Sequence, residues 1–471
     1  MSHPLLTAPI GRSLLRLAGP TTALMVVQIF VAAIDIYYIG RLGTDALAAI
    51  ALVVPFQALM LNLANGGMGG AVASALARAL GAGRLDDARG LVLHALILAT
   101  AFALGFTALA WTVGPWLFGL MGGAGSALQR AASYSHVWFS GAVLSWVSAF
   151  LGALLRGGGD AATPGRYGLV ASLIYVLLAG FLALGVGPWP GLGLIGLAIA
   201  SIVVTGAMVF VLARALWCGR LGFTPAIAGV RLQRRLFVEI LRVGVLGSFT
   251  TLLANVTAMV MTGLVGRFGV AALAGYGIGV RLEFMLVPLA FGIGSGLTTL
   301  VGVASGAHDW KRAVRVAWIG GLIAAGALGV CGWIVALVPE GWARLFTSDP
   351  QVVAATVSYI THVAPFYCLF GLGMTLSFAS QGAGRMTAPF VAGITRLIVA
   401  TVGGWFAVEI LGWGLAGVFT AIAVGMVCFG GLIAGPLVLR PWQPRRVKLF
   451  PKPGASDATP LDDRNLEPQP R

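Results

Sequence analysis

The chain has 471 residues, of which 58% are hydrophobic and only 10% are charged. A soluble globular protein carries roughly 25% charged residues, so this composition excludes a protein that folds in water. The formal net charge of +15 would by itself suggest a nucleic-acid-binding protein, but the positions of the basic residues argue against that class, as shown below.

Long apolar segments follow one another along the chain. A membrane-spanning helix needs about 20 mostly apolar residues, and twelve segments meet this requirement. They lie at residues 13–39, 46–76, 91–119, 135–155, 165–186, 192–213, 243–265, 272–303, 316–338, 352–379, 388–410 and 414–438. The sequence therefore predicts an all-α integral membrane protein with twelve transmembrane helices.

Basic residues gather on one side of these segments. With the N-terminus inside, 25 of the 30 Lys and Arg residues fall in the termini and the even-numbered loops, and this count includes Arg156, Arg385 and Arg396. The positive-inside rule then predicts a multi-pass membrane protein with both termini in the cytoplasm. The basic excess is thus a topology signal, and we expect membrane lipids rather than nucleic acid as neighbours.

The second half of the chain repeats the first. Gly40–Gly43 and residues 46–48 return as Gly266–Gly269 and residues 272–274, at an offset of 226, and Arg156–Gly159 returns as Gln381–Gly384. Six apolar segments fall in each copy. A repeat of this length in an apolar chain predicts paired membrane bundles with a site between or within them.

The repeat and the loops divide the chain. We expect an N-terminal six-helix bundle at residues 1–220 and a C-terminal six-helix bundle at 237–439. Between them, residues 221–236 are rich in Gly, Pro and Arg and predict a cytoplasmic linker. Residues 440–471 are polar and punctuated by prolines, which predicts a disordered cytoplasmic tail.

Motifs that would indicate an enzyme or an ATP-driven pump are missing from the sequence. It contains no P-loop, no HExxH zinc motif and no GxSxG elbow, which would carry phosphate binding, zinc hydrolysis and acyl transfer respectively. We therefore expect a transporter that runs on a gradient, with no cofactor other than a coupling ion, H⁺ or Na⁺.

Taken in order, the local motifs resemble the multidrug and toxic compound extrusion (MATE) family up to about residue 439. The resemblance rests on Ala18–Pro20, Asp35, Ile39–Gly43, residues 46–49, Gly266–Ala274, Tyr276–Ile278, Arg281–Glu283, Gln381–Gly384 and Pro389. Asp35 and Arg281–Glu283 are most similar to the prokaryotic DinF-type branch. The resemblance implies two six-helix bundles around a V-shaped cavity, and export of bulky, often cationic compounds in exchange for protons or sodium.

The chain departs from the family at positions that bind ions in relatives. Tyr175 and Ala179 stand where prokaryotic relatives carry an Asn and an Asp on the fifth helix. Ser201 matches a family Thr near that site, and Asn255 replaces the seventh-helix Glu of the NorM-type branch. A sodium site built as in that branch is therefore not expected.

Two acidic residues within membrane segments are the main candidates for ion coupling. A charge at the bilayer centre costs about 2.5–3.5 kcal/mol on insertion scales, and removal from water favours the protonated form of a carboxylate. Asp35 is the candidate proton carrier, with snorkelling or a hydroxyl partner as the alternative. Glu283 is interpreted as a structural residue first and a coupling residue second. Arg281 is two residues away and points to another side of the helix, so each should have other partners.

The candidate coupling residues are therefore Asp35, Ser201, Glu283 and Asn255. A polyspecific carrier also needs a large apolar wall with few polar anchors, and Met side chains adapt well to varied ligands. The candidates for this wall are Gln28, Tyr37, Met60, Met259, Tyr276 and Met285.

The sequence thus predicts a monomeric secondary antiporter that exports small molecules such as organic cations, drugs or toxic compounds by alternating access. The first alternative is a lipid-linked oligosaccharide flippase of the same superfamily. Such a protein usually has a cationic central cavity, whereas only Arg281 is predicted to be a basic residue within the membrane. A channel or a scaffold is the remaining alternative.

Overall fold

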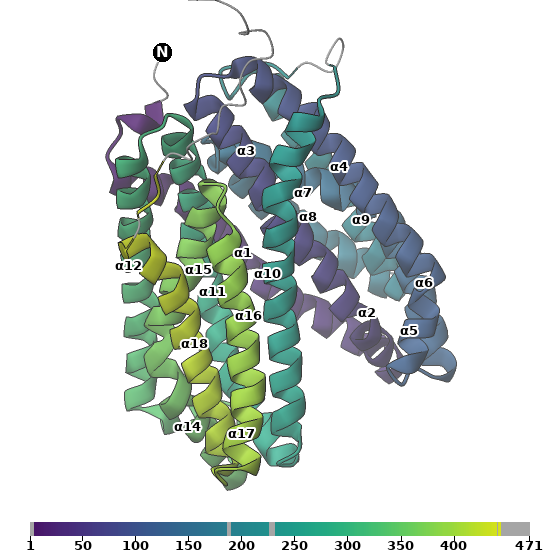
Figure 1. Ribbon diagram of the computed structural model, residues 1–471. Coiled ribbons are helices and arrows are strands. Elements are labelled where there is room, and N and C mark those ends of the chain that lie inside the picture. Colours follow the sequence, from purple (N-terminus) through teal and green to yellow (C-terminus); the bar gives the residue numbers. More distant parts are fainter. Residues whose placement is uncertain (1–3, 186–189, 226–230, 440, 444–471) are drawn as a thin grey trace, which may run out of the picture.

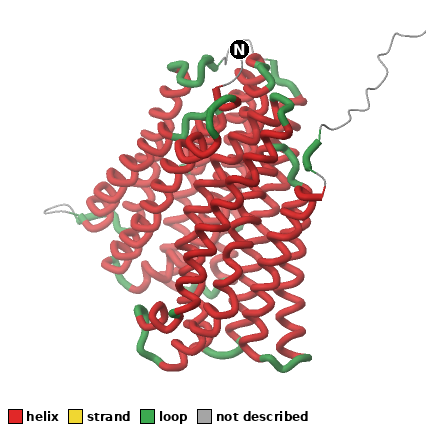
Figure 2. The backbone as a smooth tube through the Cα atoms, turned by 90° about the vertical axis from the view of Figure 1, so that its left-hand side faces the viewer, coloured by secondary structure: helices red, strands yellow, loops and turns green. Residues whose placement is uncertain are grey.

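The structure, a computed structural model, describes residues 4–185, 190–225, 231–439 and 441–443. Within these ranges the chain is almost wholly helical and forms no strand (Figures 1 and 2). The helices are η1 Pro4–Leu6, α1 Ile10–Arg41, α2 Thr44–Asn62, η2 Leu63–Met68, α3 Gly69–Gly81, α4 Leu85–Thr112, α5 Gly114–Leu120, α6 Gly125–Ser140, α7 Ala142–Gly157, α8 Ala162–Leu184, α9 Leu194–Trp217, α10 Arg234–Gly266, α11 Val270–Gly306, α12 Trp310–Leu337, α13 Pro339–Arg344, α14 Pro350–Val363, η3 Ala364–Phe366, α15 Tyr367–Gly382, α16 Thr387–Ile398, η4 Val399–Gly403, α17 Gly404–Glu409 and α18 Gly414–Leu439. The predicted all-α fold is confirmed.

The helices also agree with the predicted spans. Eleven helices or continuous helix series in the described chain are long and apolar enough to cross a membrane. A twelfth span results if α6 and α7, which are bent by 46° at their junction, cross together. The protein is therefore a multi-pass membrane protein.

The two halves of the chain form two groups of helices (Figure 1). The groups meet at the end of the molecule where α9 ends and α10 begins, and they diverge toward the opposite end. We call these the linker end and the far end. The predicted linker, 221–236, lies at the linker end, and its residues 226–230 are outside the described residues, as is nearly all of the predicted tail at 440–471.

Glycines let the two groups approach closely at the linker end. A Cβ atom at Gly81 in α3 would overlap the carbonyl group of Val303 in α11, and one at Gly306 in α11 would overlap the carbonyl group of Arg78 in α3. Glycine allows membrane helices to pack at backbone contact. The reciprocal pair therefore joins α3 and α11 at short range.

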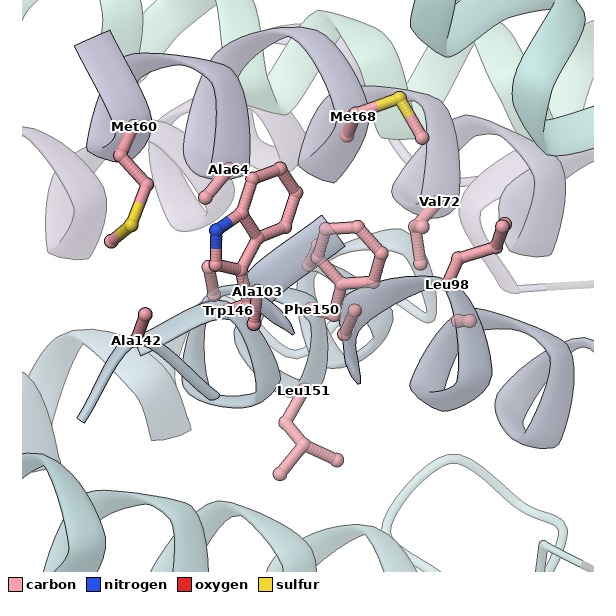
Figure 3. Packing of buried hydrophobic residues seen from close by; sticks show 14 of the residues in the cluster. Met60, Ala64, Met68, Val72, Leu98, Ala103, Ala142, Trp146, Phe150 and Leu151 are labelled. Carbon is pink, nitrogen blue, oxygen red and sulfur yellow. The ribbon is translucent and has the colours of Figure 1, made fainter. Parts of the chain in front are cut away.

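Each half has a buried apolar core. In the first half, Trp146 and Phe150 of α7 pack beneath Ala64 and Met68 of the second span (Figure 3). A second core occupies the far end of the second half around Tyr359 and other buried side chains of α11, α14 and α18.

Helix α1 packs with both halves. Its residues Leu14 and Leu17 share a core cluster with Ile293 and Leu297 of α11, whereas its remaining length lies along α8. Helix α1 therefore connects the two halves in space.

Candidate functional site

A row of polar contacts joins α1 to α8 in the first half. The Tyr175 hydroxyl donates to both carboxylate oxygens of Asp35, at 3.1 Å each. One helical face of α1 carries two further contacts. Gln28 Nε2 donates to Ser172 Oγ at 3.1 Å, and the Tyr38 hydroxyl donates to the carbonyl oxygen of Val176 at 3.3 Å.

Asp35 is thus held by a neutral partner. It takes part in none of the ion pairs found among the described residues. Tyr175 occupies the position where the sequence analysis noted an Asn in prokaryotic relatives, and Ala179, which stands in place of their Asp, is fully buried and apolar. This carboxylate can therefore change its protonation state without breaking a charge pair.

The second half contains a carboxylate of a different kind. Glu283 of α11 lies 3.8 Å from Arg396 of α16, and its other oxygen accepts from the Tyr359 hydroxyl at 3.4 Å. Both charged side chains are only 16% exposed, and the Arg396 guanidinium also lies over the ring of Phe370. As the helical spacing predicted, Arg281 is not the partner of Glu283, and it lies over the Phe346 ring instead.

The placement of Arg396 corrects the sequence analysis. The charge count assigned it to a cytoplasmic loop, but it is the tenth residue of the candidate span Thr387–Glu409. Arg281 is therefore not the only basic residue within the membrane region.

The other predicted site residues are scattered. Ser201 lies on α9 and is not a hydrogen-bond partner of Asp35. Asn255 donates to the carbonyl oxygen of Thr251 in its own helix. Met60 and Tyr276 are buried in the bundle interiors, away from any open wall in this conformation.

Four of the predicted wall residues do present open surfaces. These are Gln28, Tyr37, Met259 and Met285. Metal ligands are not grouped in the part of the chain that the structure describes, where no three His, Cys, Asp or Glu side chains could hold an ion together.

A small pocket that the sequence analysis did not predict lies between the halves, with a volume of about 10 Å³, which is room for one water molecule. Residues of η2, α3, α7, α11 and α15 line it. Its polar lining residues are Asn65, Arg156, Ser295 and Thr298, and its aromatic ones are Phe291 and Phe378. The sequence analysis counted Arg156 among cytoplasmic loop residues, whereas it occupies the last turn of α7.

Hydrogen bonds between the halves close the linker end near this pocket. Gln381 Nε2 donates to the carbonyl oxygens of Gly66 and Gly67, at 3.2 and 3.0 Å. Thr299 Oγ1 donates to the carbonyl oxygen of Arg156 at 2.9 Å. The repeat in the sequence could have pointed to these contacts, because Arg156 and Gln381 occupy equivalent positions in the two halves and each makes a hydrogen bond to the other half.

A third connection strengthens the closed end. Arg78 of α3 donates to the carbonyl oxygen of Gly382 in α15 at 3.2 Å and pairs with Glu239 of α10 at 3.4 Å. The accepting carbonyls of Gly66 and Gly67 lie in a π-helical turn, η2, a geometry often found at functional sites.

Two repeat-related helix bundles with a pocket between them and carboxylates within the spans define a membrane transporter. The chain belongs to the MatE family, whose model matches residues 20–181 and 248–406. Its relatives in this family are multidrug and toxic compound efflux transporters and not enzymes.

Individual relatives cover nearly the whole chain. An "FAD transporter" of Shewanella oneidensis is 28% identical, over 91% of this chain and 95% of that protein. A "probable multidrug resistance protein NorM" of Bradyrhizobium diazoefficiens is 30% identical, over 89% of this chain and 91% of that protein.

Solved structures show the same fold. An outward-facing multidrug resistance MATE family transporter of the MOP superfamily superimposes with a TM-score of 0.84 at 23% identity, covering 93% of this chain and 98% of that one. A MOP superfamily transporter of Pyrococcus furiosus, described as having a binding pocket of reverse polarity, has a TM-score of 0.84 at 24% identity, covering 92% and 97%.

Proposed function

We propose that this protein exports small organic compounds across the bacterial inner membrane by alternating access, in exchange for protons. Both termini and the linker end face the cytoplasm in this proposal, because 24 of the 30 basic residues fall on that side once Arg396 is placed within its span. In this orientation the protein is closed at its cytoplasmic end, and its two halves diverge toward the outer side of the membrane.

The observation that carries the proposal is the position of Asp35. It lies in α1, the helix that packs with both halves, and its hydrogen-bond partner is the neutral hydroxyl of Tyr175. A hydrogen bond to a carboxylate is roughly twice as strong as one between neutral groups. Proton uptake by Asp35 therefore weakens the attachment of α1 to α8 and frees α1 to move with α11.

Replacement of Asp35 by Asn tests this coupling. The amide mimics the protonated side chain but cannot exchange a proton, and it costs less to bury than a carboxylate. We expect Asp35→Asn to insert and fold normally but to lose efflux driven by a proton gradient in proteoliposomes. Asp86→Asn is the matched control, because the Asp86 side chain is 98% exposed and should transport like the parent.

Separately imposed proton and sodium gradients decide the coupling ion. Efflux by the parent protein under a proton gradient alone supports the proposal, and efflux under a sodium gradient alone refutes proton coupling. Full proton-driven efflux by Asp35→Asn at normal expression would transfer the coupling role to another residue such as Glu283.

Two classes of compound are candidates for the substrate. The sequence analysis favoured organic cations. The relative named as an FAD transporter makes FAD, a dianionic compound with two planar ring systems, the second candidate. Measurement of FAD in the medium of cells that do or do not express the protein distinguishes the two.

A further inference from the structure

A groove runs along α14 at the far end of the second half. It lies between α13 and α14 and has a volume of about 770 Å³. Ligand-binding pockets usually measure roughly 300–1,000 Å³, so the groove has room for one sizeable ligand. None of the candidate coupling residues lines it. We call it the α14 groove.

The α14 groove opens on the outside of the second half. Ala355 of α14 is buried against Gly275 of α11. Val353 and Val357 line the groove, and each is two positions from Ala355, which is about 200° around a helix with 3.6 residues per turn. The groove therefore faces away from α11. Because α11 itself carries the contacts with the first half, the groove opens to the bilayer and not to the space between the halves.

The groove has a charged mouth and a largely apolar course. Helix α13 connects α12 to the span that starts with α14, so it lies at the outer membrane surface in the proposed orientation. Glu340 and Arg344 of α13 form the mouth, Pro350 and Val357 line the course, and His362 lies at the other end. Twelve positions separate His362 from Pro350, or about 18 Å at 1.5 Å per residue. The hydrocarbon core of a bilayer is about 30 Å thick, so the groove has the length of one leaflet.

The two charges at the mouth are available to a ligand. Glu340 and Arg344 form an ion pair at 2.9 Å, but their side chains are 62% and 70% exposed. An exposed pair contributes only about 0–1 kcal/mol, so each charge can turn to an opposite charge of a ligand at little cost. A carboxylate beside a guanidinium complements a zwitterionic head group, because an ammonium can meet Glu340 while a phosphate meets Arg344. A purely anionic head group would lie beside the like charge of Glu340.

The inner end of the groove meets a break in the span. His362 Nδ1 lies 2.7 Å from the carbonyl oxygen of Ser358, so the ring donates within its own helix. One residue later the α-helix gives way to η3, which separates α14 from α15. A chain that fills the groove therefore covers α14 down to this break. It supports the helix that carries Tyr359, the hydrogen-bond donor to Glu283.

We propose that the α14 groove binds one zwitterionic phospholipid of the outer leaflet, of the phosphatidylethanolamine type. Its ammonium lies at Glu340, its phosphate at Arg344, and one acyl chain follows α14 toward His362. Lipid tails are as apolar in the bilayer as in the groove, so the two charges decide which lipid is bound. The lipid is a structural ligand and not the transported compound.

Two lipids with the same acyl chains test the selection. Native mass spectrometry of the full-length protein in detergent measures binding of dioleoyl phosphatidylethanolamine and of dioleoyl phosphatidylglycerol, which differ only in the head group. The parent should bind the first phosphatidylethanolamine about tenfold more tightly, equivalent to about 1.4 kcal/mol. Glu340→Gln should abolish this preference, because the freed Arg344 then accepts an anionic head group. Arg344→Gln should weaken the binding of phosphatidylethanolamine itself.

A bulky side chain tests the groove independently of the charges. Ala354 lines the groove and is exposed, so Ala354→Trp fills the path of the acyl chain without entering the core. We expect this variant to lose the tight binding of phosphatidylethanolamine. Val330→Trp is the matched control, because Val330 is 60% exposed on α12 and does not line the groove. It should bind like the parent.

The outcomes are decisive on their own. Equal affinity of the parent for the two lipids overturns the proposal, and so does an unchanged preference in Glu340→Gln or unchanged phosphatidylethanolamine binding in folded Ala354→Trp. If Ala354→Trp does not fold, the two charge variants decide the matter, since both alter exposed side chains. Transport does not enter the measurement, so a failure here leaves the proposed antiport untouched, and a failure of the antiport leaves the lipid site untouched.

Discussion

Glu283 and Arg396 lie on different helices of the second half, and each is the other's only ion-pair partner among the described residues. Removal of one member of a buried pair costs about 3–5 kcal/mol because it leaves an uncompensated charge. The two members are not equivalent, however, since a carboxylate can take up a proton whereas a guanidinium stays charged.

We therefore expect Glu283→Gln to lower the thermal unfolding midpoint in detergent more than Arg396→Gln does. The double variant should recover much of the loss, because neither charge then remains unpaired. Glu283→Gln should also retain gradient-driven efflux far better than Asp35→Asn. Equal and additive losses in the two single variants would contradict an energetic pair.

Sequence reasoning recovered some residues of the site because helical spacing is reliable over a few turns. It predicted that Arg281 would not pair with Glu283, whereas it named Gln28 only as a wall candidate and Tyr175 only as a departure from the family pattern. It missed Arg396 and Arg156, because a hydropathy average over 20 residues does not register one arginine in an apolar helix. A side chain with a long aliphatic stem can also start near a helix end and place its charge elsewhere.

At the scale of elements, the crossing of α3 and α11 depends on glycines that face main-chain atoms. Because a Cβ atom at Gly81 meets the carbonyl group of Val303, even alanine there forces the helices apart. Overpacking of this kind costs about 1–3 kcal/mol. This cost falls mainly on the conformation that is closed at the linker end, because only there do α3 and α11 touch at Gly81 and Val303.

We expect Gly81→Ala to shift the population toward a state open at the linker end. A cysteine in place of Ser305, which is 4% exposed, should then react with a water-soluble maleimide about fivefold faster or more, as a change of 1–2 kcal/mol allows. The native cysteines would first be replaced by serine. Gly326→Ala is the control, because no atom lies within 4 Å of a Cβ there, and a similar acceleration in that variant would refute the interpretation.

Hydropathy predicted the spans well because burial in lipid requires long apolar helices. It did not predict the 46° bend between α6 and α7 or the π-helical turns η2 and η4. At η2, Gln381 of α15 donates to the carbonyl oxygens of Gly66 and Gly67, and a hydropathy average does not register a tertiary contact of this kind.

At the scale of the whole molecule, the orientation in the membrane can be measured directly. In a cysteine-free background, we expect Gly222→Cys and Asp86→Cys at the linker end to react with impermeant maleimide only after cells are opened. Ala124→Cys, between α5 and α6 at the far end, should react in intact cells. The opposite pattern would reverse the membrane orientation and, with it, the proposed direction of transport.

The double attachment of α1 has a consequence for biogenesis. The Asp35–Tyr175 contact joins segments 140 residues apart, whereas Leu14 and Leu297, which share a core cluster, are separated by more than half of the chain. At a synthesis rate of about 5–20 residues per second, α1 waits roughly 15–60 s for α11 to leave the ribosome. During the later part of that interval α1 can pack against α8 but not yet against α11, so its Leu14 and Leu17 lack their partners in α11. A chain that stops before α11 therefore leaves the first helix it inserted only half assembled.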